Sequence, residues 1–169
     1  WTPFFKTWSL AGSYPKILKD KVVGETATQL FRDANKMLDE LERSKIIKNK
    51  SVIGFWPASQ DKNNEVKVYK NEKRKEQITT LNFPRQQRFQ GKGNPNLSLS
   101  DFIAPEGIDT KDYIGAFAVT SGIGVEEACA EYENNNDDYS SIMLKAIADR
   151  LAESLAEYVH EKVDRKSVV

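Results

Sequence analysis

Four ionisable side chains near the end of the sequence follow one another at helical spacing. They are Asp149, Glu153, Glu157 and His160, separated by four, four and three residues. In a helix, side chains at this spacing lie on one face, here called the acidic face. Such a face can hold a cationic ligand group through charge-assisted hydrogen bonds, each contributing roughly 1.5–3 kcal/mol where water is excluded. The alternative is a solvated face whose charge is balanced by basic residues of the same helix.

The same helix carries one half of a metal-binding pattern. Residues 157–160 match the Glu-x-x-His element of di-iron carboxylate bundles, which need two such elements from different helices. His160 is the only histidine and Cys129 the only cysteine, so a second element, a His/Cys metal cage and an internal disulfide are all excluded within this chain. We interpret His160 as a surface or supporting residue and Cys129 as a core residue.

A glycine pair could suggest a nucleotide site. Gly122-Ile123-Gly124 stands between an expected strand and an expected helix, as in dinucleotide-binding folds. Glu127 occupies the position of the third glycine, and the preceding Glu126 adds negative charge that would oppose a phosphate. A structural turn is therefore the better interpretation.

A basic segment lies in the middle of the chain, from residue 73 to residue 92. Phe83 and Phe89 are interleaved with its cations, a combination that can track nucleic-acid phosphates or dock an acidic protein. The whole chain is neutral, with 25 basic and 25 acidic residues, and no known RNA-binding motif is present. We expect a solvated loop and no nucleic-acid partner.

The remaining composition indicates one folded domain over residues 1–169, in a reducing, cytoplasmic setting. The chain is 39% hydrophobic, enough for a core. No apolar run approaches the roughly 20 residues that cross a bilayer, so we expect no membrane partner. Because the chain starts at Trp1 without an initiator Met or a signal-peptide layout, we expect it to be cut from a longer protein.

The periodicity of apolar residues predicts the elements that position these side chains. Residues 1–20 are rich in aromatics but lack a period, which indicates an irregular arm packed onto the body. The alternative is that these aromatics line a ligand cleft, but core packing is the better interpretation. Helical spacing predicts a helix over 24–43. A buried strand over 52–56, ended by Pro57, and a more exposed strand over 66–70 suggest a hairpin, and 77–81 suggests a third strand.

The second half begins with a long polar loop over 85–96. Residues 113–119 are apolar on both faces, which predicts an interior strand in the middle of the sheet. A short helix over 125–133 and a long last helix, capped by Asp137 or Asp138 and reaching about residue 163, complete the pattern. The buried stripe expected for the last helix consists of Leu144, Ile147, Leu151, Leu155 and Tyr158.

Several stretches together resemble the C-terminal activation domain of cobalamin-dependent methionine synthase. They are WTPFF (1–5), VVG (22–24), DANKML (33–38), RQQ (85–87), SDFIAP (100–105), DYIGAFAV (112–119), DDY (137–139), DRLAE (149–153) and HE (160–161). Each stretch alone is weak. Their common order and spacing cover nearly the whole chain, which makes accidental similarity improbable.

The resemblance implies an α+β fold, with a twisted, mainly antiparallel sheet, flanking helices and one long C-terminal helix. It implies binding of S-adenosylmethionine within a larger methyltransferase that moves a methyl group from methyltetrahydrofolate to homocysteine through cobalamin. The cobalamin is held by a neighbouring domain of the same parent chain. After oxidation to cob(II)alamin, an electron from a flavodoxin-type donor and a methyl group from S-adenosylmethionine restore methylcobalamin.

The resemblance also assigns two residues of the acidic face. Glu153 matches a family residue that contacts S-adenosylmethionine, where a carboxylate suits the cationic ammonium end of the ligand. Asp149 matches a position that faces the cobalamin domain, where we expect it to help hold the histidine displaced from cobalt.

Two parts of the family site are expected outside this chain. They are an aspartate directly before the tryptophan matched by Trp1 and an Arg-Pro-Ala-Pro-Gly-Tyr segment beyond residue 169. We therefore expect the isolated chain to be inactive and to bind S-adenosylmethionine weakly or not at all.

Two other functions remain open. A docking module without a small-molecule site would use the basic segment to meet an acidic flavodoxin-type donor. A standalone methyltransferase is disfavoured, because no glycine-rich nucleotide loop follows a first strand.

Overall fold

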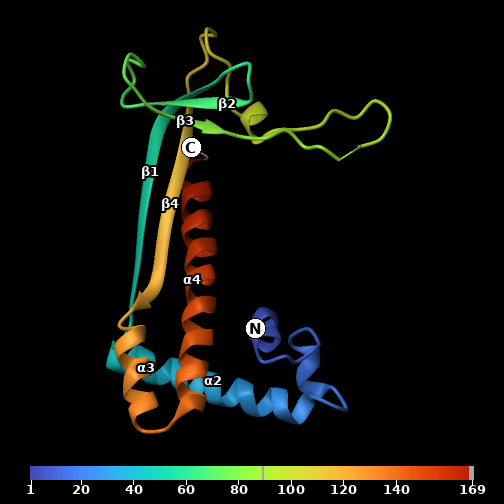
Figure 1. Cartoon of the computed structure of the whole chain (residues 1–169), viewed down its shortest axis with the longest axis vertical. Coiled ribbons are helices and arrows are strands. Elements are labelled where there is room, and N and C mark those ends of the chain that lie inside the picture. Colours follow the sequence, from blue (N-terminus) through green and yellow to red (C-terminus); the bar gives the residue numbers. More distant parts are fainter. Residues whose placement is uncertain (89, 168–169) are drawn as a thin grey trace. The chain divides into compact units, whose positions relative to one another are not determined.

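The computed structural model of the chain describes residues 1–88 and 90–167. The chain forms two compact units (Figure 1). Unit 1 comprises Trp1–Val52 and Ala118–Val169, and unit 2 comprises Ile53–Phe117. Strands β1 (Lys48–Gln60) and β4 (Asp112–Ile123) each contribute residues to both units. In the described part of the chain, no helix is both long and apolar enough to cross a membrane.

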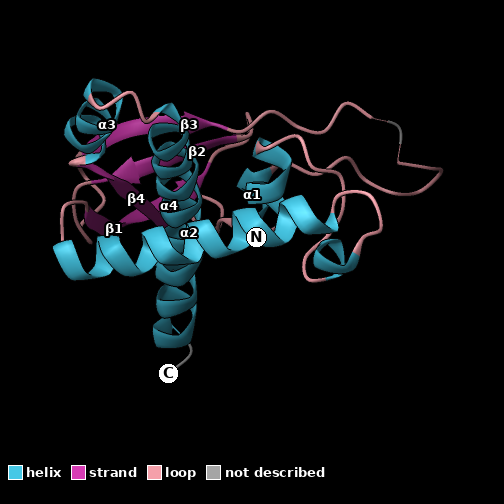
Figure 2. Ribbon diagram, turned by 90° about the horizontal axis from the view of Figure 1, so that it is seen from below, coloured by secondary structure: helices cyan, strands magenta, loops and turns pink. Residues whose placement is uncertain are grey.

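The 3-10 helix η2 (Leu99–Phe102) lies in unit 2, and unit 1 contains the other helices. They are α1 (Thr2–Thr7), the short 3-10 helix η1 (Lys16–Lys19), α2 (Gly24–Ser44), α3 (Val125–Asn134) and α4 (Asp138–Ser167) (Figure 2). α2 ends where Lys45 adopts the left-handed conformation and donates its backbone N–H to the carbonyl of Leu41. The three predicted helices are confirmed, and α4 extends four residues beyond the predicted residue 163.

The core of unit 1 is formed where α1, α2, α3 and α4 meet. Its buried residues include Phe4, Phe5, Ile17, Ala27, Leu30, Ala34, Met37, Ala128, Cys129, Met143, Leu144, Ala146 and Ile147. In the predicted stripe of α4, Leu144 and Ile147 are buried, but Tyr158 is 55% exposed. Val159 is buried in its place. The predicted stripe repeats every 3.5 residues, whereas a straight helix turns every 3.6, so the buried line moves towards later residues.

The N-terminal arm differs from the expectation of an irregular segment. Thr2–Thr7 form helix α1, with Pro3 in the first turn, where a missing backbone N–H breaks no helical bond. Phe4 and Phe5 are almost completely buried, and their rings pack edge to face with centroids 5.6 Å apart. The predicted packing of the arm is therefore confirmed. A single six-residue helix is too short to show a clear apolar period.

The sheet has the strand order β3-β2-β1-β4. β1 and β2 (Glu65–Tyr69) pair antiparallel with Ala58 opposite Val68, and β2 pairs antiparallel with β3 (Gln77–Asn82). The predicted hairpin and third strand are confirmed, as is the α+β class with an antiparallel sheet and a long C-terminal helix.

Two strand predictions are wrong in detail. β1 is not a short buried strand ended by Pro57: it continues to Gln60, and Phe55 is 56% exposed. Only Ala58 to Gln60 of β1 pair with β2. Pro57 precedes these paired residues, so its missing N–H removes no hydrogen bond between β1 and β2. β4 is not central but lies at the edge of the sheet, and its Phe117 is 43% exposed.

Candidate functional site

Helix α4 carries the acidic face in one unbroken helical segment. Asp149, Glu153 and Glu157 are therefore on one side of the helix, as predicted. All of them are exposed. The side chains of Asp149 and Glu153 retain 65% and 61% of their accessible surface. The arrangement leaves both carboxylates accessible to a partner.

Arg150 joins the two carboxylates. Its Nη1 donates to Oε2 of Glu153 at 2.7 Å, and its Nη2 donates to Oε1 of the same residue at 3.1 Å. Nη2 also donates to Oδ2 of Asp149. These carboxylates, Asp149 first, raise the pKa of the Arg150 guanidinium. One fixed positive charge thus stands between two negative ones.

A groove in unit 1 lies next to this cluster. It encloses about 240 Å³ and is lined by Trp1, Phe4, Leu38, Ile147, Arg150, Leu151 and Ser154. α1, α2 and α4 all contribute to its walls. Arg150 is a lining residue, whereas Asp149 and Glu153 are not. The two carboxylates are therefore connected to the groove through their shared guanidinium.

The groove is lined by aromatic and aliphatic side chains together with Arg150. The centroid of the Trp1 ring lies 4.5 Å from that of Phe31 and 5.5 Å from that of Phe4. These two edge-on contacts orient the Trp1 ring. The Nε of Arg150 is buried and has no hydrogen-bond partner within residues 1–88 and 90–167. Flat apolar walls beside charged groups suit a ligand with an aromatic part and a charged end.

Two arginines of the basic segment form hydrogen bonds within unit 2, which the sequence did not predict. The first of them is Arg74. Its Nη1 donates to the carbonyl of Ala58 and its Nη2 to that of Asp112, both at 2.8 Å. This guanidinium therefore ties a loop of unit 2 to two strands.

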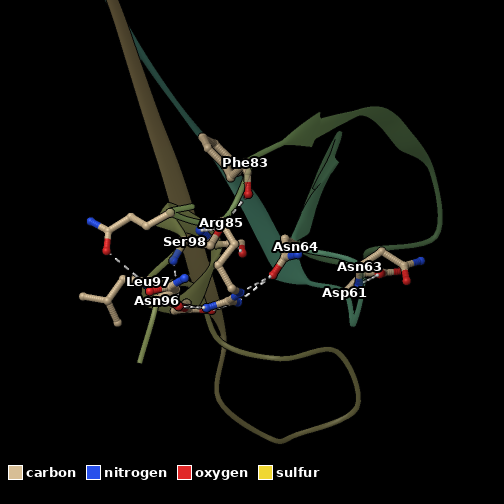
Figure 3. A network of polar contacts seen from close by, with 11 residues as sticks. Asp61, Asn63, Asn64, Phe83, Arg85, Asn96, Leu97 and Ser98 are labelled. Atoms are coloured by element: carbon tan, nitrogen blue, oxygen red, sulfur yellow. Dashed lines mark hydrogen bonds and ion pairs between the residues drawn. The ribbon is translucent and has the colours of Figure 1, made fainter. Parts of the chain in front are cut away.

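Arg85 is also held within unit 2 (Figure 3). Its Nη1 and Nη2 donate to the two carboxylate oxygens of Asp101 at 2.7 and 2.6 Å, and its Nε donates to Asn64. The Arg85 guanidinium, together with the backbone N–H of Ser98, lowers the pKa of the Asp101 carboxyl to about 2. The expectation of a solvated loop therefore fails at Arg85. The Ser98-x-x-Asp101 capping box signals the start of a short helix at Leu99, but no local pattern links Asp101 to Arg85.

Gly124 confirms the structural interpretation of the glycine pair. It has a φ of +90° and directly precedes α3. A Cβ at this position would lie 2.3 Å from the carbonyl oxygen of Ile46. The turn therefore requires glycine for backbone geometry and close packing.

Cys129 is a core residue, as predicted. It is 3% exposed, and its Sγ–H donates weakly to the carbonyl of Ser141. His160 lies at the surface of α4. Among the described residues, no group of three or more His, Cys, Asp and Glu side chains could hold a metal ion.

One polar contact between α2 and α4 was not predicted. The hydroxyl of Tyr139 donates to Oδ2 of Asp33 at 2.8 Å. Burial, followed by this bond to the Asp33 carboxylate, raises the pKa of Tyr139 to about 12. The bond links the start of α4 to α2.

The helices, antiparallel sheet and groove define an α+β domain with a candidate ligand-binding site in its helical unit. The family model for the activation domain of vitamin B12-dependent methionine synthase matches residues 1–168. The chain belongs to this family, which confirms the resemblance drawn from its collinear stretches.

A solved structure supports the assignment. The chain is similar to a crystal structure of the MetH reactivation domain bound to AdoHcy, with 48% sequence identity and a TM-score of 0.89. The match covers 96% of this chain and 50% of that chain. The chain thus spans about half the length of the solved protein.

Proposed function

We propose that the chain binds S-adenosylmethionine and supports the reductive methylation of cob(II)alamin to methylcobalamin within a methionine synthase. The observation that carries this proposal is the 48% identity, over 96% of the chain, with a reactivation domain bound to AdoHcy. AdoHcy is the product that remains when S-adenosylmethionine gives up its methyl group. A domain built for this step must therefore accept both molecules.

The groove of unit 1 is the proposed binding position. Trp1 offers flat apolar surface for the adenosyl group, with the buried Phe4 packed behind it. Glu153, held beside the groove by Arg150, would accept hydrogen bonds from the ammonium group at the amino-acid end of the ligand. The types of the side chains thus fit the two ends of S-adenosylmethionine.

Asp149 has a different proposed role. It would face the cobalamin-binding domain of the same parent chain and hold the histidine that leaves cobalt. Bound S-adenosylmethionine would supply an electrophilic methyl group to cobalamin reduced by a flavodoxin-type electron donor, with AdoHcy as the leaving product. The contribution of this chain is to position the partners and to supply electrostatic stabilisation.

Substitution of Glu153 tests the proposal in the complete enzyme. Glu153→Gln keeps the shape of the side chain and removes the charge, so we expect affinity for S-adenosylmethionine and the rate of reactivation to fall about tenfold or more. Methyl transfer from methyltetrahydrofolate should remain nearly unchanged. Titration calorimetry and assays of the two activities measure these effects.

The matched control is Glu131→Gln on α3, which removes an exposed carboxylate away from the groove. It should leave S-adenosylmethionine binding unchanged. Equal loss of both activities in Glu153→Gln would indicate a folding defect, and unchanged binding would exclude Glu153 from the site.

A further inference from the structure

We propose that Arg150 is a positioning residue that fixes the Glu153 carboxylate and thereby makes the site selective for ligands with an amino-acid end. The inference rests on the function proposed above. Arg150 is distinct from the two residues assigned by resemblance, and it is the one member of the cluster that lines the groove.

The geometry of the contacts supports a positioning role. Two nitrogens of the guanidinium bind both oxygens of Glu153, at 2.7 and 3.1 Å. A planar fork of this kind fixes the orientation of a carboxylate, whereas a lysine ammonium supplies only a point charge. Without the fork, the exposed Glu153 side chain would sample many rotamers, and ligand binding would have to order it.

Arg150 is also the anchored member of the cluster. Its side chain retains 26% of its accessible surface, against 65% for Asp149 and 61% for Glu153. It lines the groove together with Ile147 and Leu151. The packed arginine therefore sets the position of the exposed carboxylates.

The charge of this cluster explains why loss of the Arg150 contacts should weaken the binding only of ligands that carry an amino-acid end. Two carboxylates and one guanidinium give the cluster a net charge of about −1 at neutral pH. The ammonium group of the zwitterionic amino-acid end, which S-adenosylmethionine and AdoHcy share, can pair with a carboxylate of this cluster. The adenosyl part carries no charge that needs Glu153, so the fork should matter only for ligands that carry the amino-acid end.

The experiment measures three affinities in the complete enzyme for wild type, Arg150→Lys, Glu153→Gln and the double variant. The ligands are S-adenosylmethionine, AdoHcy and 5′-methylthioadenosine, which lacks the amino-acid end. We expect Arg150→Lys to weaken the first two about tenfold and to change the third less than twofold. The double variant should be no weaker than Glu153→Gln alone, because both changes remove the same interaction.

The control is Lys145→Arg, the reverse exchange on α4 at a residue paired with Glu133, which should leave all three affinities unchanged. If Glu153→Gln weakens S-adenosylmethionine binding and Arg150→Lys does not, the role of Arg150 is refuted while the proposed site stands. Equal weakening of all three ligands would show that Arg150 is merely part of the wall. If neither variant changes any affinity, the proposed site fails as well.

Discussion

Two arginine side chains orient carboxylates of this chain through paired hydrogen bonds. Arg150 gathers Asp149 and Glu153, and Arg85 holds Asp101. The sequence predicted the acidic face because helical spacing fixes which side chains share a side. The sequence did not predict the paired hydrogen bonds between each arginine and its carboxylate. These bonds depend on the arginine rotamers and, for Arg85, on a loop that brings residues 85 and 101 together.

The contact between Arg85 and Asp101 predicts a defined pH dependence. The folded state lowers the pKa of Asp101 from 3.8 to about 2. A carboxyl whose pKa is lower in the folded state contributes stability above pH 3.8, and this contribution is lost as the pH falls through about 2. The difference in urea midpoint between wild type and Asp101→Asn should therefore be largest above pH 4 and should vanish near pH 2.

An NMR titration of the Asp101 carboxyl carbon provides the direct measurement. A midpoint near 3.8 in the folded protein would show that Arg85 does not stabilise the carboxylate. A stability difference that stays constant down to pH 2 would likewise contradict the assignment.

At the scale of elements, α2, α3, β2 and β3 were predicted closely, whereas α1 was missed and β1 and β4 were predicted too short. α2 and α3 were predicted within about one residue of their observed ends, because their periods and end signals are local. The position of β4 was predicted wrongly, because an apolar strand can lie at an edge as well as in the centre of a sheet. Strand order depends on pairing between residues distant in the sequence, which composition does not encode.

The turn between β4 and α3 gives the prediction at this scale. Gly124→Ala would place a side chain at a φ of +90° and against the carbonyl of Ile46, so it should lower the free energy of unfolding by about 2–4 kcal/mol. Gly122→Ala is the matched control, since its Cβ would meet only Thr120 at an ordinary 3.6 Å. Urea denaturation measures both, and equal effects would contradict the assigned role of Gly124.

At the scale of the whole molecule, function was predicted from the order of many weak matches. The glycine pair forms a structural turn, and two arginines of the basic segment form hydrogen bonds within unit 2. The collinear stretches predicted the family, which the match over residues 1–168 confirms. The aromatic arm was expected to pack in the core, with a ligand cleft as the alternative, and both occur: Phe5 is buried in the core, while Trp1 and Phe4 line the groove.

The size of that groove leads to a prediction about the chain in isolation. It encloses about 240 Å³, less than the roughly 300–1,000 Å³ of typical small-molecule sites. The solved AdoHcy-bound protein is about twice as long as the region that this chain matches. We therefore expect the 169-residue chain to bind S-adenosylmethionine at least about tenfold more weakly than the complete enzyme, because part of the ligand would stay in water. Titration calorimetry on both proteins, with thermal unfolding to verify that the chain is folded, tests this. Equal affinities would mean that the groove and the acidic face alone hold the entire ligand.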